Sequence, residues 1–332
     1  MITITAGPSE NGSRLDRFLR KRLPLLGLSQ VYGLIRKGAV RIDDKKVKQD
    51  HRIKEGELIA IDVNESEFEA EAKPQNAMAK LVKTDFFKRN FKILYEDAGL
   101  IACDKPAGLV VHPGSGHLGH DNLIDLATAY ILSKDGGDHP CPSKGGENHT
   151  GGGTPVLMHR LDRDTSGVIL LAKNKGVVRV LHDDMRAGKF TKQYITVCHN
   201  RPPEFEDTVT FGMKRTDRRN SGMKMRVEED GGESSTTYKI IEYQNNLSRL
   251  EVLLHTGKTH QIRVHMSHLG APVLGDERYG DKQLDDKLFN SKKNLSRRLY
   301  LHAHKLSFPH PLTKKSVTIT APIPKEFVSV IN

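Results

Sequence analysis

The sequence predicts an α+β protein that combines a small helix–helix–sheet domain with a larger domain of interspersed strands and helices. Its 332 residues suit about two domains of ordinary size. Helical spacing of apolar residues and strand-like alternation occur in both parts. The charge changes sign where five acidic residues fall within 62–71, as at a domain boundary. We therefore expect the small domain at 11–65, a linker at 66–90 and the large domain at 91–332.

The small domain is expected to begin with two helices. Apolar residues at helical spacing occur on both sides of Pro24, and Ser13 is the candidate N-cap of the first helix. Short alternating strands are expected at 40–42 and 58–63. Asp43-Asp44 follows the first of these strands and is expected to make a turn.

Positive charge is concentrated in the small domain. The chain carries a formal net charge of +11, and residues 11–60 hold 13 Lys/Arg against six acids, an excess of +7. A solvated surface is the plain interpretation of scattered charges. For a compact block we favour nucleic acid, because phosphate contacts release counterions and supply affinity without sequence readout.

The same segment resembles the S-four type RNA-binding domain. The matching residues are Ser13–Leu19, Ser29-Gln30, Leu34–Val40 and Lys46-Val47. Asp43-Asp44 stands where that family usually has Asn-Gly, and it brings negative charge near the expected RNA face. The residues expected to bind RNA are Arg14, Arg17, Arg36, Lys37 and Arg41.

The large domain begins with strand-like runs at 93–95 and 100–102, separated by a hairpin turn, and a helix is expected over 122–132. Segment 133–154 holds seven glycines and is interpreted as an insertion without a role in the core. Its histidines and cysteine fit no standard zinc spacing, so a loop is favoured over a metal site.

Two apolar strands then flank a highly charged loop. Residues 160–164 hold two Arg and two Asp, more charge than a turn needs, and such a loop between rigid strands is a typical functional position. The plain alternative is a hairpin that turns at Asp164, with Arg160 and Asp162 paired at the surface. The residues alone do not choose between Asp162 and Asp164, although the suitability of Asp164 for the turn favours Asp162 slightly.

Two later segments also carry candidate residues. Lys192-Gln193-Tyr194 opens a strand, and its tyrosine fits a core position equally well. Thr259 is the expected cap of a short helix that contains Arg263. His260, His265 and His268 suggest a metal, but there is no HExxH motif, so structural or RNA-contacting roles are favoured and no metal is expected.

From about Ile93 to Val328 the chain resembles the RluA-type pseudouridine synthases. The segment His159–Gly167 matches the signature HRLDxxTSG, Lys192–Tyr194 matches KxY, and Gly257–His265 matches G(R/K)xHQIRVH. Gly275–Gly280 and Leu301–Ala303 extend the match. The insertion at 133–154 is the main departure, and Lys258 replaces a common Arg.

This resemblance implies a mixed central sheet with a cleft, and isomerisation of a uridine within RNA without cofactor or metal. Asp162 matches the nucleophilic aspartate, and Arg263 matches the arginine that pairs with it and keeps it ionised. Tyr194 matches the aromatic residue that stacks on the base and takes the proton from carbon 5. Arg160 matches the residue that fills the gap left by the flipped base, and His159 is expected beside it at the substrate RNA.

Two rival functions remain from the sequence. A non-catalytic RNA-binding or ribosome-assembly factor fits the composition, but the enzyme is favoured because the aspartate, tyrosine and arginine occur together in family order. A metal-dependent nuclease needs clustered carboxylates, and none stand out.

The sequence segments HRLDRDTSG and DERYGD are most similar to the RluC-like branch, which modifies large-subunit rRNA. The segment VVHPGSG is similar to the RluD-like branch. We expect large-subunit ribosomal RNA as the partner, tRNA as the alternative, and a monomer. The longest clean apolar run, Val168–Ala172, is too short for a membrane span. Three widely spaced cysteines and no secretory signal fit the cytoplasm.

Overall fold

A computed structural model describes residues 2–8, 10–23, 28–63, 81–112, 122–134, 155–216, 224–292 and 294–332. The described residues fall into two compact units, one within 1–87 and 112–140, the other within 88–111 and 141–332. Residues 66–80 of the predicted linker and 135–154 of the predicted insertion lie outside the described residues. No helix in the described part of the chain is long and apolar enough to cross a membrane.

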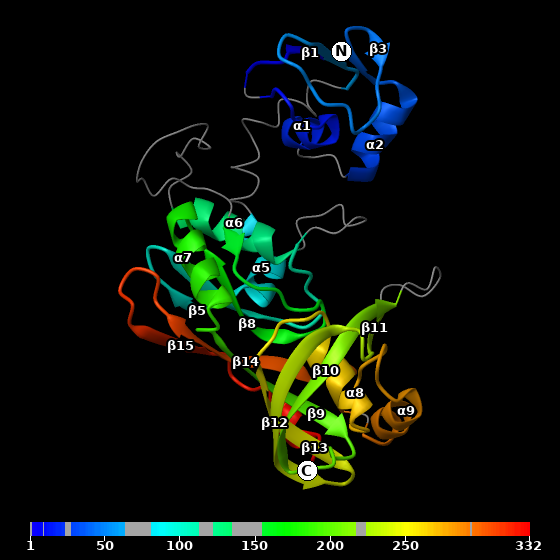
Figure 1. Ribbon diagram of the computed structural model, residues 1–332, viewed down its shortest axis with the longest axis vertical. Coiled ribbons are helices and arrows are strands. Elements are labelled where there is room, and N and C mark those ends of the chain that lie inside the picture. The colour runs from blue at the N-terminus through cyan, green and yellow to red at the C-terminus, as the bar shows by residue number, and fades with distance from the viewer. Residues whose placement is uncertain are drawn as a thin grey trace. The chain divides into compact units, whose positions relative to one another are not determined.

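The first unit contains an antiparallel sheet with the strand order β1-β4-β2-β3. Figure 1 labels two of its strands, β1 and β3. Its strands are β1 (Ile2–Thr5), β2 (Val40–Ile42), β3 (Lys45–Lys46) and β4 (Leu58–Ile61). Asp43 and Asp44 join β2 to β3 with φ values of 47° and 63°. Two successive left-handed residues are typical of a two-residue hairpin turn, so the predicted turn is confirmed.

The helices of this unit are α1 (Leu15–Arg22), α2 (Leu28–Lys37) and α6 (Leu123–Lys134). Leu15, Leu19 and Val31 from α1 and α2 are buried with Ile59 of the sheet, which gives the unit its own core. The predicted Ser13 cap is wrong: Arg14 is the N-cap and its side chain makes no capping bond.

One helix occupies part of the segment predicted as a linker. Helix α5 (Asp85–Asn90) begins after Thr84, whose Oγ1 accepts a hydrogen bond from the backbone N–H of Phe87. This cap ties down the first turn of a helix too short to be stable on propensity alone.

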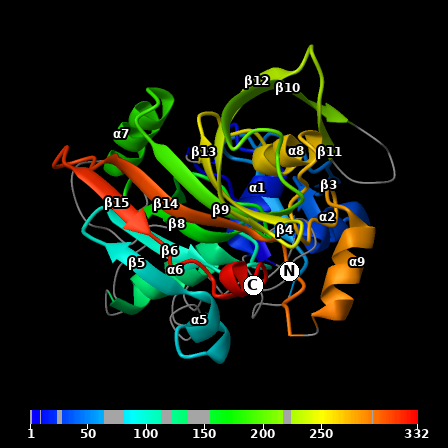
Figure 2. The ribbon, with the colours of Figure 1, turned by 90° about the horizontal axis from the view of Figure 1, so that it is seen from below.

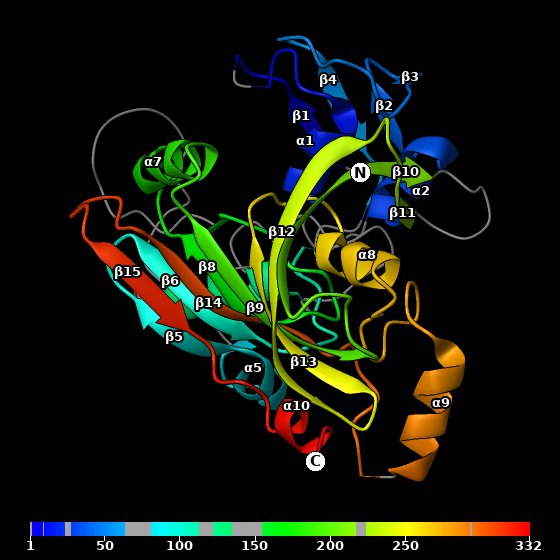
Figure 3. The same ribbon diagram turned by 60° about the horizontal axis from the view of Figure 1, so that its bottom comes forward.

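The second unit contains a large mixed sheet (Figures 2 and 3). Its order is β11-β10-β12-β13-β9-β14-β8-β6-β5, and β15 and β7 pair with β14 and β8. The strands are β5 (Lys92–Glu96), β6 (Leu100–Lys105), β7 (Val156–Leu157), β8 (Ser166–Ala172), β9 (Thr191–His199), β10 (Glu206–Thr216), β11 (Lys224–Val227), β12 (Gly232–Gln244), β13 (Leu247–Leu254), β14 (Leu301–Pro309) and β15 (Ser316–Thr320). The β14–β8 pair is parallel and the other pairs are antiparallel, which confirms the predicted mixed sheet.

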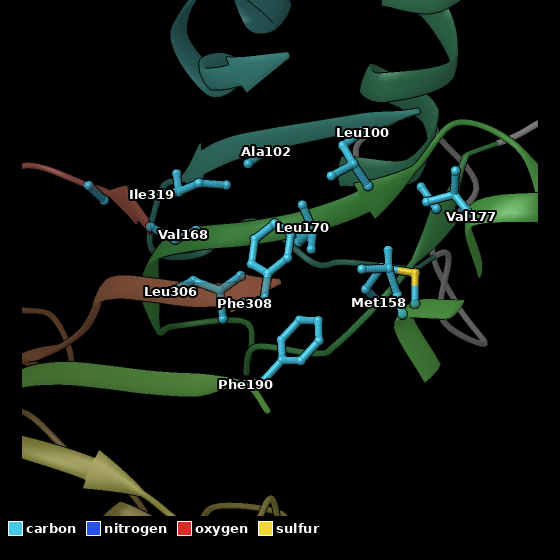
Figure 4. Packing of buried hydrophobic residues seen from close by; sticks show 13 residues of the cluster. Leu100, Ala102, Met158, Val168, Leu170, Val177, Phe190, Leu306, Phe308 and Ile319 are labelled. Carbon is cyan, nitrogen blue, oxygen red and sulfur yellow. The ribbon is translucent and has the colours of Figure 1, made fainter. Parts of the chain in front are cut away.

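Strand β8 is central to this unit because all seven of its residues are buried. Figure 4 shows Val168 and Leu170 of β8 packed near Phe308, whose ring stacks on Phe190 at 5.1 Å between centroids. At its start, Gly167 has φ +111°, and a Cβ there would lie 2.2 Å from the carbonyl oxygen of Ala303 in β14. Only glycine therefore allows β14 to pair this closely with the strand that follows the charged loop.

The remaining helices are α7 (Lys175–Arg186), α8 (Gln261–His268), α9 (Lys282–Ser291) and α10 (Glu326–Ser329). Figure 3 shows α8 beside the curved strand β12. The predicted Thr259 cap is wrong, because His260 is the N-cap, in the left-handed region at φ 56°, without a side-chain capping bond. The side chain of Gln261 instead accepts from the backbone N–H of Lys258, which orders the approach to α8.

Candidate active site

The charged loop before β8 and helix α8 bring Asp162 and Arg263 together. The Nη1 of Arg263 donates to Oδ2 of Asp162 at 3.0 Å, although the residues are 101 positions apart. The Asp162 side chain is 28 % exposed and that of Arg263 only 10 %, so the carboxylate faces solvent and the guanidinium backs it. The sequence alternative in which Asp162 pairs with Arg160 is wrong. The neighbouring Asp164 pairs with exposed Arg163 instead.

A second carboxylate holds the other side of Arg263. Both Nε and Nη2 of Arg263 donate to Asp276 at 2.7 Å. Burial alone would raise the pKa of Asp276, but the hydrogen bonds and charge of Arg263 and the backbone N–H groups of Arg278 and Tyr279 hold that pKa below its ordinary value. Burial would likewise lower the pKa of Arg263, yet the two carboxylates raise it above its ordinary value. Arg263 is therefore a fixed cation.

Tyr279 and His260 complete this side of the site. The guanidinium carbon of Arg263 lies 5.2 Å from the centre of the Tyr279 ring. The Tyr279 hydroxyl accepts from the backbone N–H of Met225 in β11 and lies 2.8 Å from Nδ1 of His260. The Nε2 of His260 is 3.6 Å from Oδ2 of Asp162. Burial is the main cause that lowers the pKa of His260, so the ring is neutral near pH 7.

Strand register places Tyr194 near the same loop. Tyr194 pairs with Ala303 of β14, and Ala303 also pairs with Gly167 of β8, so the three lie in one row across the sheet. Burial, followed by the negative charge of Asp162, raises the pKa of Tyr194 above its ordinary value. Tyr194 is thus a protonated, largely buried phenol within the field of Asp162.

His159 and Arg160, next to each other in the charged loop, differ in their exposure and contacts. The Nε2 of His159 accepts a hydrogen bond from the backbone N–H of Leu170 at 3.1 Å, so this ring ties the charged loop to β8. Burial lowers the pKa of His159 to about 3, which keeps Nε2 available as an acceptor. Arg160 is exposed. Of the two residues expected at the substrate RNA, Arg160 is exposed, whereas His159 is partly buried and bonded to β8.

A buried lysine also fixes the charged loop. The Nζ of Lys105, at the end of β6, donates to the carbonyl oxygens of Pro106, Leu109 and Arg163 at 2.7–2.9 Å. The ammonium group is fully buried, and burial lowers its pKa to about 7. Its three N–H groups bind three carbonyls, so it holds the backbone beside Asp162 in place.

Another polar cluster lies at the start of β8. The Oγ of Ser166 is 2.9 Å from Nδ1 of His302 and accepts a bond from Arg298. Arg298 also donates to Glu326 at 3.0 Å. The serine of the His159–Gly167 segment is therefore a structural anchor for the strand that carries the loop.

The residues expected to bind RNA lie in the first unit. Arg17, Arg36, Lys37 and Arg41 are exposed on α1, α2 and β2. Arg14 is engaged differently, since its Nη2 pairs with Asp16 at 2.8 Å. The first unit therefore presents four of the five predicted cations to solvent without a carboxylate partner among the described residues.

Asp276, Tyr279 and Lys105 were not predicted to belong to the site. The segment Gly275–Gly280 was recognised only as an extension of the family match. The sequence feature that could have pointed to the site is the presence of Asp276 and Tyr279 between its two glycines. Within the described ranges, no three histidine, cysteine or carboxylate side chains come together as a metal site. Cys103 and Cys198 are free and buried.

Comparisons with known proteins identify two families along the chain. The sequence profile of the family described as RNA pseudouridylate synthase matches residues 99–268, and that of the S4 domain matches residues 13–59. These two stretches contain Asp162, Tyr194 and Arg263, and the cations of the first unit.

Similar proteins extend over nearly the whole chain. The "Ribosomal large subunit pseudouridine synthase C" of Buchnera aphidicola subsp. Schizaphis graminum is 34 % identical over 96 % of this chain and 93 % of its own. The protein of the same name from Escherichia coli K12 is 32 % identical over 97 % and 92 %. Among solved structures, "Human RNA Pseudouridylate Synthase Domain Containing 4" is 25 % identical with a TM-score of 0.56, over 77 % of this chain and 95 % of that one.

Proposed function

Because this chain belongs to the RNA pseudouridylate synthase family, we propose that it isomerises uridines of large-subunit ribosomal RNA with Asp162 as its nucleophile. The observation that carries the site assignment is the 3.0 Å contact between Arg263 and Asp162, which presents a half-buried carboxylate to solvent. The full-length relatives named for the ribosomal large subunit support the choice of substrate.

The proposed chemistry rearranges one nucleotide. Asp162 attacks carbon 1′ of the ribose, and the bond from that carbon to N1 of uracil breaks. The freed uracil, which keeps the electron pair of the broken bond at N1, turns within the site. A bond then forms between carbon 1′ and carbon 5 as the bond to Asp162 breaks, carbon 5 loses its proton, and N1 takes up a proton. Product and substrate are isomers, so the reaction requires no cofactor.

Each neighbouring residue has a proposed part in these steps. Arg263 keeps Asp162 ionised and oriented. Tyr194 packs against the turning base. Its hydroxyl is protonated at neutral pH, so it takes the carbon 5 proton only as it passes its own proton on to another acceptor. Exposed Arg160 fills the space that the flipped nucleotide leaves in the RNA. His159 acts through the loop, because its ring is bonded to Leu170.

The first unit, with its S4 match at 13–59, is proposed to dock the RNA. Arg17, Arg36, Lys37 and Arg41 contact phosphates, while Arg14 orders the start of α1 through Asp16. We further propose a domain at 11–65, a catalytic domain at 91–332, and action as a monomer in the cytoplasm.

Mapping pseudouridines in cells with and without the gene tests this function. Sites should disappear from large-subunit rRNA on deletion, return with the wild-type gene, and stay absent with the Asp162→Asn variant expressed at an equal level. Loss confined to tRNA would assign the other substrate. Restoration by Asp162→Asn would refute the proposed nucleophile.

A further inference from the structure

Arg263 shares a single positive charge between two carboxylates. Its bonds to Asp276, from Nε and Nη2, are both 2.7 Å long, while its bond to Asp162, from Nη1, is 3.0 Å. The Asp276 side chain is 0 % exposed. The guanidinium thus donates two hydrogen bonds to the buried carboxylate of Asp276 and one to the carboxylate of Asp162.

This arrangement leaves one oxygen of Asp162 without a protein partner. Oδ2 accepts from Arg263, whereas Oδ1 accepts no hydrogen bond among the described residues. A guanidinium that turned freely could instead bind both oxygens in a planar fork, its preferred geometry with a carboxylate. Such a fork would occupy the lone pairs that a nucleophile needs.

We infer that Asp276 is a positioning residue that fixes the plane of Arg263, so that Asp162 is oriented through one oxygen while the other stays free to attack. The inference rests on the proposed role of Asp162. Asp276 also offsets the charge of Arg263, so the two carboxylates and the guanidinium carry a net charge of −1. Asp276 therefore weakens the attraction of Arg263 for the Asp162 carboxylate, which leaves the free oxygen of Asp162 more nucleophilic than it would be in an isolated pair.

The surroundings of Asp276 suit this task. Its Oδ1 accepts from the backbone N–H groups of Arg278 and Tyr279 at 2.9 and 3.0 Å, so the carboxylate is held by the turn as well as by Arg263. A Cβ at Gly280 would lie 2.4 Å from the carbonyl oxygen of Asp276, so this turn closes only with glycine there. The Tyr279 ring covers one face of the guanidinium, which limits its rotation further.

Single-turnover kinetics with the full-length protein test the inference. The substrate is protein-free large-subunit rRNA transcribed with uridine tritiated at carbon 5, because isomerisation releases that hydrogen to water. Asp276→Asn should lower the rate at saturating enzyme about 100-fold, as expected for a misoriented reactive group, with unchanged RNA affinity. Asp276→Glu keeps the charge but moves the carboxylate by one methylene. Its rate should therefore fall between the rates of the wild-type protein and of Asp276→Asn.

Asp97→Asn is the matched control. Asp97 also accepts from two backbone N–H groups, of Gly99 and Leu100, and pairs with His310, but it lies in the β5–β6 turn. This variant should keep the wild-type rate. In addition, the effects of Asp162→Asn and Asp276→Asn on the free energy of unfolding should be non-additive, because both carboxylates bind one guanidinium.

The outcomes separate this inference from the proposed function. A wild-type rate for Asp276→Asn, with Asp162→Asn inactive, overturns the positioning role and leaves the nucleophile in place. A wild-type rate for Asp162→Asn overturns the proposed function itself. If Asp276→Asn fails to fold, a wild-type rate for Asp276→Glu overturns the inference, and a reduced rate with unchanged RNA affinity supports it.

Discussion

At the scale of single residues, the site depends on pairs that are far apart in the chain. Asp162, Tyr194 and Arg263 were predicted because their motifs occur in family order. Composition and spacing alone did not distinguish Asp162 from Asp164, and the structure separates them by their partners, Arg263 and Arg163. Asp276 was missed because an aspartate directly after a glycine is typical of an ordinary turn.

Buried histidines give the protein a residue-level pH dependence. Burial lowers the pKa of both His265 and His302 to about 4. Both rings are neutral in the folded protein but take up a proton on unfolding below about pH 6.5. Because the unfolded state then binds more protons, stability should fall as the pH falls from about 6.5 to about 4, by up to about 1.4 kcal/mol per pH unit for each group.

The His265→Gln variant isolates one of these groups. The Nε2 of His265 lies 2.8 Å from Oγ of Ser234, and a glutamine amide can occupy the same position without titrating. Urea unfolding between pH 7 and pH 4.5 should therefore show a shallower loss of stability in the variant. An unchanged pH dependence would contradict the assignment of His265 as a neutral buried ring.

At the scale of elements, the register of β8, β14 and β9 aligns the charged loop with Tyr194. The turn at Asp43-Asp44 was predicted from local sequence, and both residues have the positive φ values of a hairpin turn. The starts of α1 and α8 were not predicted, because contacts from distant parts of the chain order them. The carboxylate of Asp16 accepts from the hydroxyl of Tyr32, and the side-chain amide of Gln261 donates to the carbonyl oxygen of Ser235.

Gly167, at the start of β8, is a position where substitution should disturb the pairing of two strands. Gly167→Ala meets left-handed strain of about 1–3 kcal/mol and must also separate β8 from β14. Gly108→Ala is the matched control, with φ +86° but no atom within 4 Å of the new Cβ. Urea unfolding should show Gly167→Ala to be the more destabilised by at least about 2 kcal/mol, the scale of overpacking. Equal losses would mean that the close approach of Ala303 does not matter.

At the scale of the whole molecule, charge and chemistry lie in different parts of the chain. Residues 11–60 carry an excess of +7 out of +11, while the proposed nucleophile and its partners lie between 162 and 279. The sequence predicted this division from the distribution of charge. It could not predict which cations stay unpaired, because the Arg14–Asp16 contact depends on the geometry at the start of α1.

A triple variant tests this division in the full-length protein. Replacing Arg36, Lys37 and Arg41 by serine should weaken rRNA binding. The steepness with which the log of the binding constant falls with the log of salt concentration should decrease by about 2–3, roughly one for each lost phosphate contact. The control replaces three exposed lysines, Lys314, Lys315 and Lys325, by serine. The control should have a smaller effect on the slope, and equal effects would contradict a docking role for the first unit.

The central claim is that Asp162, not the adjacent acidic residue of the same loop, is the nucleophile. Its most direct test compares Asp162→Asn with Asp164→Asn in single-turnover release of tritium from carbon 5-labelled large-subunit rRNA, with RNA affinity measured alongside. We predict no release above background for Asp162→Asn, near wild-type release for Asp164→Asn, and unchanged RNA affinity for both. Wild-type release by Asp162→Asn would contradict the claim.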